Sequence, residues 1–110
     1  MKVEFKDNSR EILKAMEKAK HNALEAIGLT AETYAKQETP VDTGRLRNSI
    51  SHAVDGEAAY IGSNVEYAPY VELGTSRAKA HHMLQKAATE HSAEYKRLAE
   101  DAVYSAINNV

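Results

Sequence analysis

The sequence predicts an α+β fold in which two long helices pack on a small antiparallel β-sheet. Apolar residues recur at intervals of three and four before Pro40 and again after Ala80, as expected for amphipathic helices. Between these stretches the period changes to two, and the pair Asp55-Gly56 gives a hairpin signal. Helices at both ends with strands in the middle are typical of an α+β domain.

Size and composition limit the kinds of protein that the chain can be. With 110 residues, we expect a single domain over 1–110 with a modest core. The absence of cysteine excludes a disulfide framework and a thiolate metal site. No stretch is apolar for the roughly 18 residues of a membrane span, and the start of the chain has the form of neither a signal nor a transit peptide. We therefore expect a protein without a membrane partner.

The charge is evenly distributed. The 14 basic and 16 acidic residues are mixed in similar numbers in each part of the chain and give a net charge of −2. Proteins that bind nucleic acid tightly carry a basic patch or stripe, and none is visible here.

The first long helix is predicted over residues 9–38, a length of roughly 45 Å. Asn8 precedes Glu11 by three residues, in the form of a capping box, so the helix should begin near Ser9. Pro40 should end it, and Gly28 predicts a bend or break within it. Its apolar stripe consists of Ile12, Met16, Ala19, Ala23, Ile27, Ala31 and Tyr34.

The segment before this helix is a possible N-terminal strand. Val3 and Phe5 alternate with charged residues, which is a strand pattern of minimal length.

A turn and a hairpin should follow Pro40. The Asp42 carboxylate can accept hydrogen bonds from free backbone N–H groups and so cap a short helical turn over residues 43–47. Alternation then begins at Ser49 and predicts a hairpin over residues 49–63. With Asp55 and Gly56 as its loop, Ile50 would pair with Ile61.

The last part of the chain should contain a short helix and a long one. Residues 67–74 predict one or two helical turns, with Pro69 in the first turn and Gly74 as the stop. The small polar loop 75–80 should be mobile and without local anchors. A final helix is predicted over 82–108, with the stripe Leu84, Ala88, His91, Tyr95, Leu98, Ala102 and Ala106. The stripes of both long helices should form the core, and their distal ends are candidates for packing on neighbouring copies.

The sequence contains no residue pattern typical of a metal site or a catalytic site. A metal site would need three or four convergent ligands, but His81 and His82 would point about 100° apart on a helix, with His91 further along. A hydrolytic triad could be assembled from Ser49 or Ser51, His52 and Asp42 or Asp55. The strained nucleophile turn that such a triad needs is missing from the sequence. We predict no catalytic residue, no cofactor and no metal.

The cations near the centre of the chain allow two interpretations. They could contact phosphate groups weakly, or they could form ion pairs within the chain or across a subunit interface, and we favour ion pairs. The cations are Arg45, Arg47, Arg77 and Lys79, and their possible partners are Asp42, Glu66 and Glu72.

Two dense motifs carry a family resemblance. The motif P-V-D-T-G-R-L-R-N-S-I covers residues 40–50, and Y-A-P-Y-V-E-L-G-T covers 67–75. Their form and separation resemble those of the tail-completion or neck proteins of long-tailed bacteriophages. That family commonly has an aromatic- and proline-bearing segment before its last helix, where this chain has His81-His82-Met83-Leu84. The docking of the last helix is therefore open.

The resemblance implies a non-enzymatic structural protein of a phage virion, made in the bacterial cytoplasm. It implies a homo-oligomeric ring, hexameric in form, at the head-proximal end of the tail around the DNA channel. The implied partners are other copies of the chain, the neighbouring connector or stopper protein, and a tail terminator or tail-tube protein. DNA would be met only as it passes through the channel.

Two groups of residues are assigned roles on these motifs. The structural group, in which turn chemistry organises the junction after the first helix, is Pro40, Asp42, Thr43, Gly44, Leu46 and Ser49. The interface candidates, chosen because Tyr and Arg often carry interface energy, are Tyr67, Tyr70, Glu72, Gly74, Thr75 and Arg77.

Two alternatives stay open at this point. A small helical dimer could act as a regulatory or nucleic-acid-binding protein, although the net charge of −2 and the lack of a basic recognition helix speak against it. A metal-dependent or hydrolytic enzyme would require His81, His82 and His91 to converge.

Overall fold

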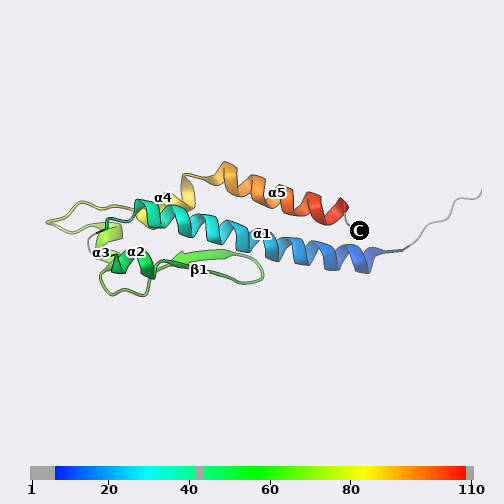
Figure 1. The fold of residues 1–110 in the computed structure, drawn as a ribbon, viewed down its shortest axis with the longest axis horizontal. Coiled ribbons are helices and arrows are strands. Elements are labelled where there is room, and N and C mark those ends of the chain that lie inside the picture. Colours follow the sequence, from blue (N-terminus) through cyan, green and yellow to red (C-terminus); the bar gives the residue numbers. More distant parts are fainter. Residues whose placement is uncertain (1–6, 42–43, 109–110) are drawn as a thin grey trace, which may run out of the picture.

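A computed structural model describes residues 7–41 and 44–108 of the chain (Figure 1). The fold is α+β, as predicted, with one two-stranded antiparallel sheet in these residues. The possible strand around Val3 and Phe5 lies outside the described residues. The elements in chain order are α1 (Ser9–Glu38), α2 (Arg45–Ser49), β1 (Ser51–Val54), β2 (Ala59–Gly62), α3 (Ala68–Leu73), α4 (Met83–Thr89) and α5 (Ser92–Asn108).

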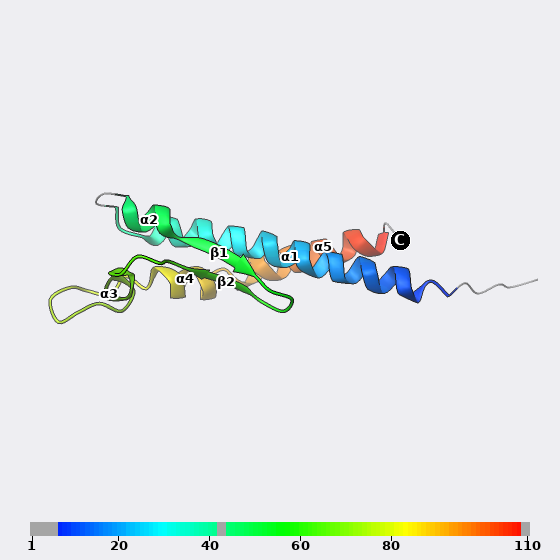
Figure 2. The same ribbon diagram turned by 90° about the horizontal axis from the view of Figure 1, so that it is seen from below.

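Helix α1 is the central element of the fold. Helix α5 runs along one side of it and the β1–β2 hairpin along another, while α2, α3 and α4 gather around its C-terminal end (Figures 1 and 2). The Cα radius of gyration is 19.2 Å, against about 13 Å for a compact chain of this length. The molecule is therefore elongated.

The ends of α1 follow the predicted bounds. It begins at Ser9, but Asn8 makes no side-chain capping hydrogen bond, so the predicted capping box is wrong. Instead, Oδ1 of Asp7 accepts from the backbone N–H and the hydroxyl of Ser9. At the other end Thr39 turns to extended backbone before Pro40, as expected, and its hydroxyl donates to the carbonyl of Ala35 at 2.6 Å.

Gly28 does not break α1, so the predicted break is wrong. The helix is continuous through it, and a Cβ at this position would lie 2.8 Å from Cδ2 of His52 on β1. The glycine therefore serves close packing, because it lets the hairpin approach the helix backbone.

The hairpin has a longer loop than predicted. Ser51 pairs with Gly62 and His52 with Ile61, so the loop contains residues 55–58 rather than two residues. Oδ1 of Asp55 accepts from the backbone N–H groups of Glu57 and Ala58, both at 2.8 Å. This carboxylate organises the wider turn. The predicted register was wrong by two residues, a shift that keeps each side chain on its predicted face.

The short helices largely follow their turn signals. Gly44 has φ 82° and precedes α2, which begins at Arg45 rather than at residue 43 and continues to Ser49. For this reason the first strand begins at Ser51 and not at Ser49. Helix α3 has Pro69 in its first turn and ends at Gly74, which has φ 77°, as predicted.

The predicted final helix over 82–108 is two helices. Helix α4 ends at Thr89, and α5 begins at Ser92 and is displaced from its axis (Figure 1). The hydroxyl of Tyr95 donates to the carbonyl of Ala87, which in a continuous helix would accept from the backbone N–H of His91. The His91 ring stacks on Tyr34 of α1, with centroids 3.5 Å apart and planes inclined by 2°. These contacts from distant residues hold the break in place.

The main cluster of buried residues lies at one end of the molecule, and Ala19, Ala23 and Ala31 of α1 are buried outside it. It forms where the C-terminal half of α1 meets α2, α3 and α4, and Met83 at its centre is fully buried. No residue of α5 is buried. The core residues are Ala35, Leu46, Ile50, Val65, Ala68, Met83 and Ala87.

Candidate assembly surface

The first motif builds the junction between α1 and the hairpin. Leu46 enters the core, and Gly44 is buried where the chain turns into α2. The hydroxyl of Ser49 donates to the carbonyl of Leu46 at 2.6 Å and hydrogen-bonds Ser63 across the start of the hairpin at 2.5 Å. Pro40 is exposed. Asp42 and Thr43 lie outside the described residues, so their capping role stays a prediction.

An ion pair links the first motif to Glu66, the residue before the second motif. Both terminal nitrogens of Arg45 on α2 donate to the carboxylate of Glu66, at 3.1 and 3.0 Å, and the guanidinium lies 5.4 Å from the ring centroid of Tyr67. The hydrogen bonds from Arg45 lower the pKa of Glu66. For Arg45 the ion-pair interpretation is confirmed. Because both side chains are largely exposed, the pair fixes geometry more than it adds stability.

Glu72 has a role inside the chain that the sequence did not reveal. Its two carboxylate oxygens accept from the backbone N–H groups of Leu84 and Gln85, at 2.8 and 3.0 Å. Its backbone carbonyl accepts from the N–H of His82 at 3.1 Å. Glu72 therefore caps α4, and this contact docks the start of the C-terminal helices on α3. The sequence contained one signal for this role, because His82, the residue before α4, has no side-chain oxygen that could cap the helix.

The loop after α3 is locally anchored, contrary to expectation. The hydroxyl oxygen of Thr75 accepts from the backbone N–H groups of Arg77 and Ala78, at 3.2 and 3.0 Å. The backbone of Thr75 donates in turn to the carbonyl of Ala78 at 2.9 Å. Gly74 permits this turn, because a Cβ there would lie 2.7 Å from the backbone nitrogen of Ala80.

Helix α3 presents an exposed apolar pair. Tyr70 is 63% exposed and Leu73 is 71% exposed, and their separation of three residues places them on one face. Tyr67, in contrast, packs partly against the core. We call Tyr70 and Leu73 the α3 pair. The sequence identified Tyr70 as an interface candidate but missed Leu73.

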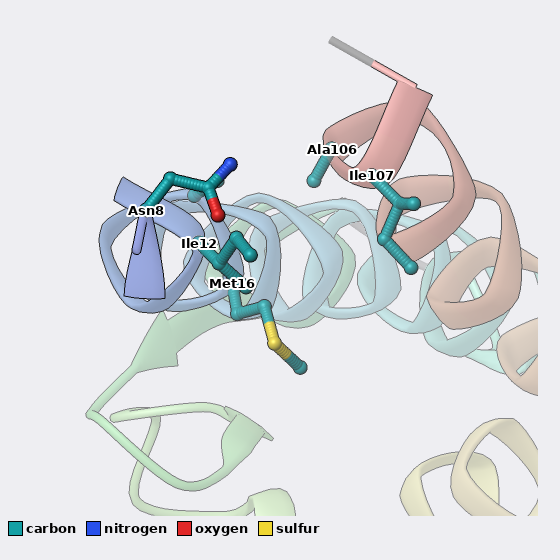
Figure 3. A pocket seen from close by; sticks show the side chains of 6 residues that line it. Asn8, Ile12, Met16, Ala106 and Ile107 are labelled. Atoms are coloured by element: carbon teal, nitrogen blue, oxygen red, sulfur yellow. The ribbon is translucent and has the colours of Figure 1, made fainter. Parts of the chain in front are cut away.

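A second apolar surface lies at the opposite end of the molecule. Between the first turns of α1 and the end of α5 is a groove of about 400 Å³, lined by Asn8, Ile12, Ala15, Met16, Ala106 and Ile107. Figure 3 shows Ile12 and Met16 from α1 facing Ala106 and Ile107 from α5. We call it the α1–α5 groove. Its large side chains remain substantially exposed, Ile107 to 60%.

The histidines and serines do not assemble into a catalytic site. No group of three His, Cys, Asp or Glu residues within 7–41 and 44–108 could hold a metal ion. His91 lies on Tyr34, and His82 takes the left-handed backbone conformation (φ 50°) before α4. His52 contacts Glu25 and Glu32 on α1, while Ser49 bonds Ser63. Of the residues considered for a triad, Ser49, His52 and Asp55 thus have other partners, while Asp42 lies outside the described residues.

Among the described residues, no helix is both long enough and apolar enough to cross a membrane.

Comparison with known families decides the assignment. A family model described as "Bacteriophage HK97-gp10, putative tail-component" matches residues 3–74. The chain belongs to this family. The matched region of the tail component begins before α1 and ends at Gly74, and it contains the first motif and most of the second. Helices α4 and α5 follow it. No curated protein and no solved structure matches the chain.

Membership establishes a coarse function. The tail component is a structural protein of a phage virion and works among other tail proteins. The resemblance seen in the two motifs is thereby confirmed. Both apolar surfaces can now be considered as places where such a protein meets its neighbours.

Proposed function

We propose that this tail component completes or joins the head-proximal end of the tail as a non-enzymatic subunit of a hexameric ring around the DNA channel. The observation that carries the proposal is the presence of two uncovered apolar surfaces at opposite ends of an elongated chain. They are the α3 pair and the α1–α5 groove.

The position of these surfaces favours ring formation. Two different patches on one chain make heterologous contacts, and such contacts generate a closed ring when the rotation between subunits allows it. An exposed tyrosine beside a leucine, and a groove lined by Ile and Met, are also the residue types that interface centres favour. The lack of buried residues in α5 also favours ring formation, because a neighbouring subunit can cover the apolar side chains that the chain itself leaves exposed.

The charges near the α3 pair suit a protein partner. Within the described residues the side chains of Arg77 and Lys79 form no ion pair, and both are exposed beside α3. Carboxylates of an adjacent ring could pair with them. We assign these adjacent rings to the connector or stopper protein on one side and to the tail terminator or tail-tube protein on the other.

Complementation of a phage that lacks this gene tests the proposal. Tyr70→Ala and Arg77→Glu should leave heads and tails unjoined, while the purified variants keep the wild-type helix content and melting temperature. The matched control is Tyr60→Ala, since Tyr60 on β2 is 57% exposed and belongs to neither surface. It should give normal particles.

One outcome of this experiment would contradict the proposal. Normal yields of joined, infectious particles from both Tyr70→Ala and Arg77→Glu would show that the α3 surface is not the interface.

A further inference from the structure

His52 is the point at which the hairpin contacts α1 through polar groups. Its Nδ1 lies 3.1 Å from Oε1 of Glu32, and its Nε2 lies 3.1 Å from Oε2 of Glu25. Both carboxylates come from the face of α1 that also carries Gly28, which leaves room for the imidazole between them. The imidazole is therefore flanked by the two carboxylates and lies close to Gly28 of α1.

This geometry specifies the protonation state of the ring. A neutral imidazole has one N–H donor and one acceptor nitrogen, whereas ionised carboxylates only accept. Two carboxylates within hydrogen-bond distance of the two nitrogens are both satisfied only if the ring is an imidazolium. The electrostatics agree, because the hydrogen bonds to Glu32 and then Glu25 raise the pKa of His52.

The charges around His52 compensate only in part for a lost proton. On α1, Nζ of Lys36 lies 3.2 Å from Oε2 of Glu32, so that carboxylate has a second cation. The carboxylate of Glu25 has only His52 as an ion-pair partner within the described residues. On the hairpin, the residue opposite His52 is the apolar Ile61. A neutral ring would therefore leave an unprotonated nitrogen facing a carboxylate.

We propose that His52 is a proton-dependent clasp, which holds the β1–β2 hairpin on α1 while it is an imidazolium and releases the hairpin when it loses its proton. A two-stranded hairpin has little stability of its own and depends on its packing partner. The other ion pair between the hairpin and α1 joins Lys20 to Glu57 at 3.0 Å, but it is exposed and correspondingly weak. The inference is independent of the ring assembly proposed above.

An NMR titration of the full chain tests the clasp directly. At about pH 7, where a free histidine with a pKa of about 6.5 is mostly neutral, both ring nitrogens of His52 should carry protons. Glu25→Gln and Glu32→Gln should each move the His52 titration to lower pH. Glu17→Gln is the matched control, because Glu17 lies on the same helix and pairs with Lys20 rather than with His52.

Amide hydrogen exchange then tests release of the hairpin. Protection factors of Ala53 and Tyr60, relative to that of Ala31 in α1, should fall about tenfold as His52 loses its proton. In His52→Gln this ratio should be low at every pH and should not change with pH.

Two results would overturn the clasp. One is a His52 ring with a single protonated nitrogen at pH 7 in the wild-type chain. The other is hairpin protection that stays constant through the His52 titration. Both are measured on the wild-type protein, so the test does not depend on the folding of any variant.

Discussion

The carboxylate of Glu72, at the end of α3, accepts a hydrogen bond from the backbone N–H of Leu84 in the first turn of α4, at 2.8 Å. Its other oxygen accepts from Gln85 at 3.0 Å. The first N–H groups of a helix have no partner within the helix, and a negative charge is favourable at this end. Glu72 thus joins the second motif to the C-terminal helices.

Glu72→Ala should lower the free energy of unfolding by about 1–2 kcal/mol, because two backbone donors lose their acceptor. Urea denaturation followed by circular dichroism measures this loss. Glu90→Ala, an exposed glutamate at the end of α4 that makes no such cap, should change stability by less than about 0.5 kcal/mol. Equal effects of the two substitutions would show that the cap is not important.

Gly74→Ala should destabilise the protein by about 1–3 kcal/mol. The position has φ 77°, and an added Cβ would lie 2.7 Å from the backbone nitrogen of Ala80 and 2.9 Å from the carbonyl oxygen of Ala78. Gly56→Ala is the control, since a Cβ there would meet nothing within 4 Å and its φ is not positive. A Gly74→Ala variant as stable as Gly56→Ala would contradict this role.

Gly28→Ala should destabilise the protein, even though alanine is preferred to glycine by about 1 kcal/mol inside an exposed helix. The new Cβ would lie 2.8 Å from Cδ2 of His52, whose ring is held by Glu25 and Glu32. In a His52→Ala background the same substitution should cost much less, because the ring atoms are gone and only the Cβ of residue 52 remains, 3.3 Å away. A double-mutant cycle measured by thermal unfolding gives the sign of each step. A stabilising effect in the wild-type background would disprove close packing at this site.

The clasp also predicts how stability depends on pH. The pKa of His52 is raised by its hydrogen bonds to Glu32 and Glu25, so its contribution is complete below the unfolded value of 6.5 and is lost as pH rises through the folded pKa. The pKa of Glu32 is lowered by its hydrogen bond to His52, so its contribution is complete above 4.5 and is lost as pH falls through the folded pKa. The combined contribution is largest between these two limits.

Melting temperatures of the wild type and of His52→Gln, measured from about pH 4 to pH 9, check this prediction. The difference between the two proteins should be greatest between about pH 5 and 6.5 and should shrink on both sides. A difference that grows as the pH rises above 7 would have the wrong sign.

Local signals were sufficient for much of the fold. The start of α1 near Ser9 was predicted correctly, although the capping box that suggested it does not form. The end of α1 before Pro40 depends on residues adjacent in the sequence and was predicted. The same is true of α3, which Pro69 and Gly74 delimit. Even the incorrect hairpin register kept the correct faces, because the alternation of side chains survives a shift of two residues.

The errors have a common cause in contacts between distant residues. Gly28 was interpreted as a break because its partner, His52, lies 24 positions away. The interruption at His91 depends on its stacking against Tyr34 and could not be read from the helical periodicity. The capping role of Glu72 likewise depends on α4 reaching α3.

The candidate surface was predictable only in part. Tyr70 was identified because tyrosine beside a motif is a frequent interface residue, and it is exposed in the structure. The α1–α5 groove was not predicted as a groove, since an apolar stripe does not show whether the chain itself covers it. The stripe that contains Ile12 and Met16 was assigned to the core, with its distal end as a candidate for packing on neighbouring copies, and the core cluster ends before it reaches these two residues.

The position of the protein in the virion is the most direct test of the account. Electron cryomicroscopy of phage particles carrying a tagged copy of this chain locates it without any assumption about its contacts. We predict one ring of tag density, with six copies, at the head-proximal end of the tail. Tag density along the tube or at the distal tip, or purified particles that lack the protein, would contradict it.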